Sequence, residues 1–145
     1  MKGDECLGGS LAFVILENLK GHEDIEQNRL EALRKEIESD GLLKKAIAVD
    51  EKTWVVIDDH LRLHALMLLG CSRIPALFLD YSSPKIHVKA WQPGEIVTKE
   101  DVIRAGLSGQ KMPPRTSRHL VEGPWGLKHI SFIEKDVYLS LEELL

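Results

Sequence analysis

The sequence predicts a single mixed α/β (α+β) domain over residues 1–145, in which helices flank a mixed sheet. A length of 145 residues suits one domain with one hydrophobic core. Short apolar runs of strand length alternate with segments of helical periodicity along the chain. A content of 43% hydrophobic and 29% charged residues is ordinary for a globular protein.

The first two elements are predicted from an apolar run and a helical repeat. Residues 11–17 (LAFVILE) alternate little and predict a buried strand. Residues 25–39 predict an amphipathic helix, because Leu30 and Ile37 fall on the same face. Gly41 follows this segment and is expected to end the helix.

The middle of the chain predicts a strand pair, a buried helix and a further strand. Residues 46–49 and 54–57 flank a short polar turn, as in a hairpin or a close strand pair. Residues 59–69 predict a helix that is apolar nearly all round beyond its first turn, and Gly70 ends it. Residues 73–81 (RIPALFLDY) predict another strand.

The last third predicts shorter elements around a polar loop. Residues 85–91 alternate cleanly and predict a half-exposed strand. Residues 98–105 predict a helix that is capped by its threonine and ended by Gly106. Residues 109–119 (GQKMPPRTSRH) predict a loop because they are polar and rich in proline. A short strand over residues 137–139 precedes a final helical turn.

Charge and composition argue against several classes of protein. The net charge is −4 and no long Lys/Arg stripe is present, so we expect no nucleic-acid partner. The longest apolar run, LAFVIL, is far shorter than the ~20 residues needed to cross a bilayer, so we expect no membrane partner. The N-terminus lacks the apolar segment of a signal peptide, which predicts a cytoplasmic protein. Cys6 and Cys71 have no metal-binding spacing.

Ionisable residues gather where a predicted strand meets a helix, in VVIDDHLRLHALMLLG (residues 55–70). The first turn of a helix leaves N–H groups unpaired and attracts anions, most often phosphate. His60 and Arg62 add side-chain donors at this turn. Asp58, at the end of the strand, would repel a phosphate unless Mg²⁺ lay between them. The mixture of acids and bases therefore fits a metal–nucleotide complex.

Simpler readings of the same stretch stay open. Asp59 could be a helix N-cap, Arg62 a solvated side chain and His64 a core histidine with its hydrogen bonds satisfied. His60 and His64 are four residues apart, as in a zinc-binding helix, but the glutamate of an HExxH motif is missing.

The run VIDDHLRLHALMLLGCSRIPALFLD resembles the nucleotide-binding signature of the ParB/sulfiredoxin superfamily, roughly V-D-G-H-H-R-x-x-A-x-x-x-L-G followed by a strand that opens with I-P. The matching positions are Asp58, His60, Arg62, Gly70 and the pair Ile74–Pro75. Asp59 stands where glycine is usual, and Leu61 stands where a second histidine is usual. The resemblance implies a ParB/sulfiredoxin-like mixed sheet with flanking helices.

Further motifs are similar to those of the archaeal free serine kinases. Lys20–Glu23 (KGHE) resembles their K-P-H-E motif, and Pro114–His119 (PRTSRH) resembles their P-K-T-T-R-H loop. Val88–Pro93 (VKAWQP) and the terminal DVYLSLEELL also match. The resemblance implies a cytoplasmic kinase that moves a phosphoryl group from ATP or ADP to free L-serine, with Mg²⁺ as cofactor. Its product, O-phospho-L-serine, would serve cysteine biosynthesis.

The resemblance also implies roles for residues in these motifs. Glu23 would take the proton of the serine hydroxyl; alternatively, it only favours the positive end of the following helix. Asp58 would bind Mg²⁺ or steer the hydroxyl. His60 and Arg62 would hold the nucleotide phosphates, and Gly41 lies near where the family binds nucleotide.

Recognition of serine requires partners for a carboxylate. Thr116, Ser117, Arg118 and His119 form a donor-rich loop that suits this role, although a solvated connection is the alternative. Trp91 would wall the pocket or lie in the core or at a rim.

Three rival functions use the same superfamily signature. A DNA-partition or transcription module would append a helix-turn-helix, and we see no basic recognition helix in these residues. A sulfiredoxin-like reductase needs a cysteine directly before the His-Arg pair, where this chain has none. A non-catalytic nucleotide sensor would not need a second-substrate site. The choice between ATP and ADP and the oligomeric state stay open.

Overall fold

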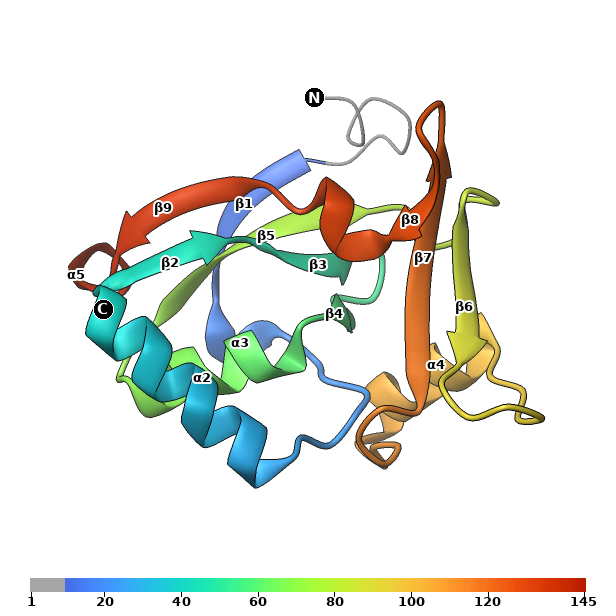
Figure 1. Cartoon of the computed structure of the whole chain (residues 1–145), viewed down its shortest axis with the longest axis horizontal. Helices are drawn as coiled ribbons and strands as arrows, with labels where there is room; N and C mark the ends of the chain where they lie inside the picture. The colour runs from blue at the N-terminus through green and yellow to red at the C-terminus, as the bar shows by residue number, and fades with distance from the viewer. Residues whose placement is uncertain (1–9) are drawn as a thin grey trace.

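The structure, a computed structural model, describes residues 10–145 and has the predicted α+β architecture (Figure 1). The strands are β1 (Ser10–Ile15), β2 (Leu42–Lys45), β3 (Ile47–Asp50), β4 (Val56–Asp58), β5 (Arg73–Leu79), β6 (Ile86–Ala90), β7 (Ser117–Gly123), β8 (Gly126–His129) and β9 (Asp136–Ser140). The helices are α2 (Gln27–Asp40), α3 (His60–Leu68), α4 (Lys99–Ser108) and α5 (Leu141–Leu144), with 3₁₀ turns η1 (Leu16–Asn18) and η2 (Ile130–Ile133). Within residues 10–145, no helix is long and apolar enough to cross a bilayer.

The central sheet has the strand order β1-β5-β3-β4 and is mixed. β3 runs parallel to β5, whereas β1–β5 and the predicted β3–β4 hairpin are antiparallel. Its two faces contribute to different hydrophobic clusters, as the alternation of side chains along a strand requires. Ala76 and Phe78 pack with α2 and α3, whereas Leu77 and Leu79 pack with α4, β6 and β7. Burial on both faces explains why β5 is almost continuously apolar.

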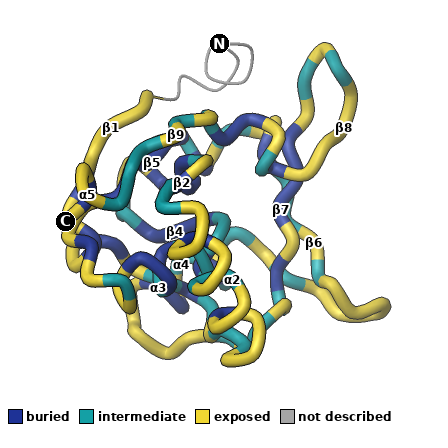
Figure 2. Tube along the Cα trace, turned by 60° about the vertical axis from the view of Figure 1, so that its left-hand side comes forward, coloured by how far each residue is buried: buried dark blue, intermediate teal, exposed yellow. Residues whose placement is uncertain are grey.

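Strand β1 is not buried, which contradicts the prediction from its apolar run. It is an edge strand, and Leu11, Phe13 and Ile15 are each about half exposed (Figure 2). Only Val14, which points toward the cluster formed with α2 and α3, is buried. Apolar composition alone did not reveal that the opposite face of this edge strand is left uncovered.

Helix α4 begins as predicted but ends later. Thr98 and Asp101 form a capping box. Gly106 lies inside the helix, and a Cβ at this position would lie only 2.6 Å from a methyl group of Val55. Gly109, with a φ of 79°, ends the helix instead. The glycine at position 106 therefore allows α4 to pack closely against Val55, the residue that directly precedes β4.

The predicted loop over residues 109–119 also needs correction, because Ser117 begins strand β7. β7 pairs with β6 on one side and with β8 on the other. The sequence reading missed β2, β7 and β8, whose pairing partners lie far along the chain or across a short turn. As a result, the second half of the PRTSRH motif is held on a sheet rather than on a mobile segment.

Candidate functional site

A cavity of about 620 Å³ lies among the segment before α2, the β4–α3 junction and the start of β7. This volume is within the range of small-molecule sites. Most of the predicted site residues line it: Glu23, Asp58, His60, Arg62, Trp91, Ser117, Arg118 and His119. Gly41 and Thr116 do not line it. The fold therefore brings the KGHE motif, the strand–helix junction and the PRTSRH motif to one place.

Asp59 shapes the start of α3. Its backbone is left-handed, with φ 74° and ψ 57°, and its side chain accepts a hydrogen bond of 3.0 Å from the N–H of Arg62. This confirms the N-cap reading of Asp59. Aspartate tolerates the left-handed region better than most residues, so it can replace the usual glycine at this turn.

Arg62 lines the cavity, but its guanidinium is engaged by protein groups. Nη2 lies 2.7 Å from Asp59 Oδ2, and Nη1 donates to the Ala46 carbonyl over 3.0 Å. Nη1 also lies 3.5 Å from Glu134 Oε1. The guanidinium has five N–H donors, so these three contacts do not by themselves require Arg62 to leave Asp59 in order to bind a phosphate.

Asp58, Asp59 and Glu134 form a carboxylate cluster in which one oxygen from each lies within 4.8 Å of the others. Glu134 is buried, and neither of its carboxylate oxygens accepts a hydrogen bond within residues 10–145. Burial raises the pKa of Glu134 well above its usual range, and the nearby Asp58 raises it further. Burial also raises the pKa of Asp59, against the opposing effect of Arg62. Three oxygen ligands, one of them from a buried carboxylate that lacks a hydrogen-bond donor among the described residues, fit a hard divalent cation such as Mg²⁺.

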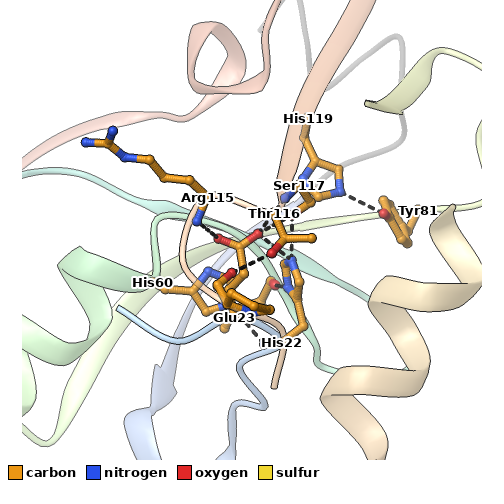
Figure 3. Close-up of polar contacts among 10 residues, drawn as sticks. His22, Glu23, His60, Tyr81, Arg115, Thr116, Ser117 and His119 are labelled. Carbon is orange, nitrogen blue, oxygen red and sulfur yellow. Dashed lines mark hydrogen bonds and ion pairs between the residues drawn. The ribbon is translucent and has the colours of Figure 1, made fainter. Parts of the chain in front are cut away.

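Glu23 is held by the start of β7 (Figure 3). Its Oε1 accepts a 3.1 Å hydrogen bond from the Arg115 N–H, and its Oε2 accepts bonds of 2.9 and 2.5 Å from the N–H and hydroxyl of Ser117. Backbone hydrogen bonds that join His22 and Asp24 to Met112 tie the two segments together. Burial raises the pKa of Glu23 above its usual value, although the Ser117 and Arg115 donors oppose this. A carboxylate with raised basicity, at a cavity wall, suits proton abstraction.

Three buried histidines, His22, His60 and His119, lie beside Glu23. The His22 ring bonds the Val56 carbonyl through Nδ1 over 2.8 Å, and its backbone N–H donates to His60 Nε2 over 3.0 Å. Burial lowers the pKa of His22 to about 4 and those of the other two well below the usual value. His60 is therefore neutral, with its proton on Nδ1 because Nε2 accepts. It could offer a phosphate a neutral N–H rather than a positive charge.

Trp91 and Arg118 form the rim of the cavity. The Arg118 guanidinium carbon lies 5.3 Å from the centroid of the Trp91 ring, a cation–π arrangement. Trp91 directly follows β6, Arg118 lies in the neighbouring strand β7, and Trp91 is 47% exposed. Trp91 is thus a rim residue.

The other predicted residues of the PRTSRH motif have different positions. His119 is buried, and its Nε2 lies 2.7 Å from the Tyr81 hydroxyl. Thr116 donates its hydroxyl to the Pro113 carbonyl over 2.6 Å. The donor-rich loop is therefore not one continuous ligand surface, because the strand turns Ser117 and His119 inward and leaves Arg118 exposed.

Gly41 lies away from the cavity. It is the C-cap of α2, with a φ of 69°, as its role in ending the helix predicted. Its carbonyl accepts a 3.1 Å hydrogen bond from Leu141, which ties this turn to the C-terminal segment. The expected closeness of Gly41 to a nucleotide phosphate is not supported by this position.

Several residues of the cavity were missed from the sequence. Arg29, Lys45 and Arg115 add positive charge to its lining. Arg29 lies in helix α2 and Lys45 lies in strand β2, which was not predicted. No sequence motif marked either residue as part of a binding site. Arg115 lies within the PRTSRH motif, which could have identified it. Glu134 lies in a connecting segment whose sequence gives no hint of a buried carboxylate.

Comparisons with curated proteins identify archaeal relatives, although no model of a known protein family matches the chain. A ParB-like protein of Sulfolobus acidocaldarius is 30% identical over 135 residues, covering 88% of this chain and 61% of the relative. An ADP-dependent L-serine kinase of Thermococcus kodakarensis is 32% identical over 85 residues, covering 56% and 35%. An ATP-dependent L-serine kinase of Desulfurococcus mucosus is 30% identical over 103 residues, covering 66% and 40%. The chain thus spans less than two thirds of each of these relatives.

Solved structures share the fold over nearly the whole chain. A free serine kinase in complex with AMP superposes with a TM-score of 0.76 and 18% identity, covering 93% of both chains. SbnI from Staphylococcus aureus superposes with a TM-score of 0.68 and 14% identity, covering 92% of this chain and 88% of its own. At these identities the likeness establishes the fold.

Proposed function

We propose that this chain, which is similar to a ParB-like protein and to archaeal L-serine kinases and has the fold of a free serine kinase, phosphorylates free L-serine. The phosphoryl donor would be ATP or ADP, and the product would be O-phospho-L-serine. One observation carries the proposal: Glu23, a carboxylate of raised pKa, lines the same cavity as the N-terminal turn of α3.

Glu23 would accept the proton of the serine hydroxyl as that oxygen attacks the terminal phosphorus. An ionised carboxylate has about four lone-pair positions. Arg115 and Ser117 together donate three hydrogen bonds to it, which leaves room for the substrate hydroxyl. The two flanking backbone donors fix the orientation of the carboxylate, and positioning is the main contribution of a protein to phosphoryl transfer.

The nucleotide phosphates would lie at the start of α3. The free N–H groups of the first turn and the Nδ1–H of His60 supply donors, and Arg29, Lys45 and Arg115 supply positive charge nearby. Asp58, Asp59 and Glu134 would hold Mg²⁺, which neutralises phosphate charge when bound.

Serine would be recognised at the rim. Arg118 can pair with the substrate carboxylate through its planar fork, while the Trp91 ring holds the guanidinium in place. A role in cysteine biosynthesis in the cytoplasm of an archaeon belongs to the same proposal, and the archaeal L-serine kinases among its relatives support it.

The test is incubation with L-serine, Mg²⁺ and either ATP or ADP, followed by phosphorus NMR for O-phosphoserine. Formation of phosphoserine with one donor supports the proposal and identifies that donor. Absence of product with both donors, from folded protein, would remove it.

A second candidate is a nucleotide-binding module that acts in DNA partition or transcription. The ParB-like relative, which aligns with 88% of this chain, favours it. A gel-shift assay at low salt, with and without nucleotide, separates the two: specific DNA retention without serine phosphorylation would favour this candidate.

A further inference from the structure

The hydroxyl of Ser117 lies between two hydrogen-bond acceptors. Its Oγ is 2.5 Å from Glu23 Oε2 and 2.9 Å from His22 Nε2. All three groups are buried or nearly so, and the side chain of Glu23 is 13% exposed. His22 Nε2 also lies 3.7 Å from Glu23 Oε2, which is beyond hydrogen-bond distance. The hydrogen bonds that link the base to the histidine therefore run through the Ser117 hydroxyl (Figure 3).

Counting hydrogens shows that this hydroxyl cannot serve both neighbours at once. The His22 Nδ1 lies 2.8 Å from the Val56 carbonyl, which can only accept, so the ring proton is on Nδ1. The ring is neutral at pH 7, because burial lowers the pKa of His22 to about 4. His22 Nε2 is then an acceptor, as is ionised Glu23, and Ser117 has one hydrogen to donate.

We propose that Ser117 and His22 are positioning residues that form a hydrogen-bond switch behind Glu23. The Ser117 hydrogen points to the carboxylate while Glu23 is ionised. When Glu23 gains a proton, the Ser117 hydrogen turns to His22 Nε2. The switch rests on the proposed function only for the source of that proton, which is the serine hydroxyl. In that reaction the serine oxygen forms the new bond to phosphorus as the bond between phosphorus and the leaving nucleotide oxygen breaks.

The switch gives Ser117 a partner in both states of the base. Without His22, the hydroxyl would stay on the carboxylate, stabilise its charged form and make Glu23 a weaker base. Other titratable groups also face this pair and must be held constant in a test. They are Asp58 from β4, His60 from α3 and His119 from β7, with the two histidine rings 4.5 and 5.9 Å from that of His22.

The test is the titration of Glu23, followed by the carbon-13 signal of its side-chain carboxyl and assigned with Glu23→Gln. Ser117→Ala removes a donor to the charged form and should move the midpoint up by about one pH unit. Ser117→Thr keeps the hydroxyl and should leave the midpoint at its wild-type value. His22→Asn keeps a donor near Nδ1 but removes the Nε2 acceptor, so the midpoint should fall, whereas His22→Gln restores an acceptor and should reverse much of this fall.

The decisive comparison is His22→Asn with and without the hydroxyl. In the Ser117→Ala background, His22→Asn should cause no further shift, because the effect of His22 passes through Ser117. An equal shift in both backgrounds would overturn the switch, as would an unchanged midpoint in Ser117→Ala. If the His22 variants fail to fold, the Ser117→Ala and Ser117→Thr pair still decides whether the hydroxyl bonds the charged base. The titration needs no turnover, so its result is independent of the phosphoserine assay. If the proposed function also holds, the acidic limb of the pH profile of kcat should shift in the same direction as the Glu23 midpoint in each variant.

Discussion

Glu23 accepts hydrogen bonds from both the N–H and the hydroxyl of Ser117, although 94 positions separate the two residues. This contact joins the segment before α2 to the first residue of β7. It places a carboxylate of raised pKa at the wall of a cavity that the start of α3 also lines.

Glu23→Gln should reduce kcat for phosphoserine formation by at least about 100-fold, because general-base catalysis typically contributes 10²–10⁴-fold. The amide keeps the size of the side chain, so the nucleotide dissociation constant, measured by calorimetry, should change little. Glu31→Gln is the matched control, since Glu31 lies on α2 outside the cavity lining and pairs with Arg34. Loss of nucleotide binding in Glu23→Gln would show that Glu23 has a different role.

Arg118→Ala should raise the KM for L-serine by roughly tenfold or more, since a charge-assisted hydrogen bond contributes about 1.5–3 kcal/mol. The nucleotide dissociation constant should stay near its original value. Arg104→Ala, on α4 and outside the cavity lining, controls for the loss of a surface charge. An unchanged KM in Arg118→Ala would place the serine carboxylate elsewhere.

Glu134→Gln should stabilise the metal-free protein at pH 7, because burial disfavours the ionised carboxylate of Glu134 and an amide carries no charge. The folded pKa of Glu134 is raised above its unfolded value, so wild-type stability is higher at low pH and falls as pH rises above 4.5 through the folded pKa. The advantage of the variant should therefore shrink toward pH 4.5 in urea unfolding curves.

The same variant tests the carboxylate cluster as a cation site. Mg²⁺ should raise the melting temperature of the wild type, and Glu134→Gln should weaken this effect. Mn²⁺ binding, followed by electron paramagnetic resonance, gives the affinity directly, with Glu122→Gln as a control at an exposed carboxylate. Equal Mn²⁺ affinity in the wild type and in Glu134→Gln would exclude Glu134 as a ligand.

Asp59→Ala should destabilise the fold by about 1–2 kcal/mol more than Asp59→Gly. Both lose the N-cap contact to Arg62, but alanine also meets the strain of a φ of 74°, which glycine does not. Asp59→Asn keeps a capping oxygen and tolerates this backbone, so it should stay close to wild type. Urea unfolding measures all three, and the opposite order of alanine and glycine would contradict the left-handed turn.

Gly106→Ala should cost about 1–3 kcal/mol of stability, although alanine favours a helix interior by about 1 kcal/mol. The reason is the 2.6 Å approach of the added methyl group to Val55. Val55→Ala in the same chain should recover part of this loss, because it removes the clashing methyl groups. Additive losses in the double variant would show that the two positions are not in contact.

Local patterns predicted much of the fold and the core of the site. The strand–helix junction at Asp58, the capping threonine of α4 and the glycine after α2 each depend on neighbours within a few residues. The resemblance of short motifs to those of the free serine kinases then pointed to Glu23 and Arg118, and both residues line the same cavity. Gly41 was expected near the nucleotide site but does not line the cavity. A glycine at this position predicts that the helix ends there, but it does not predict where that end lies relative to the rest of the fold.

The sequence by itself determined the α+β architecture and the acid-rich start of α3, because capping, periodicity and turn chemistry act over a few residues. Only the tertiary structure decided that Glu134 joins Asp58, that Ser117 lies between Glu23 and His22, and that β1 is left exposed. Strand pairing and burial arise from contacts between distant parts of the chain. The pKa of a carboxylate follows from that burial, so no local pattern could reveal it.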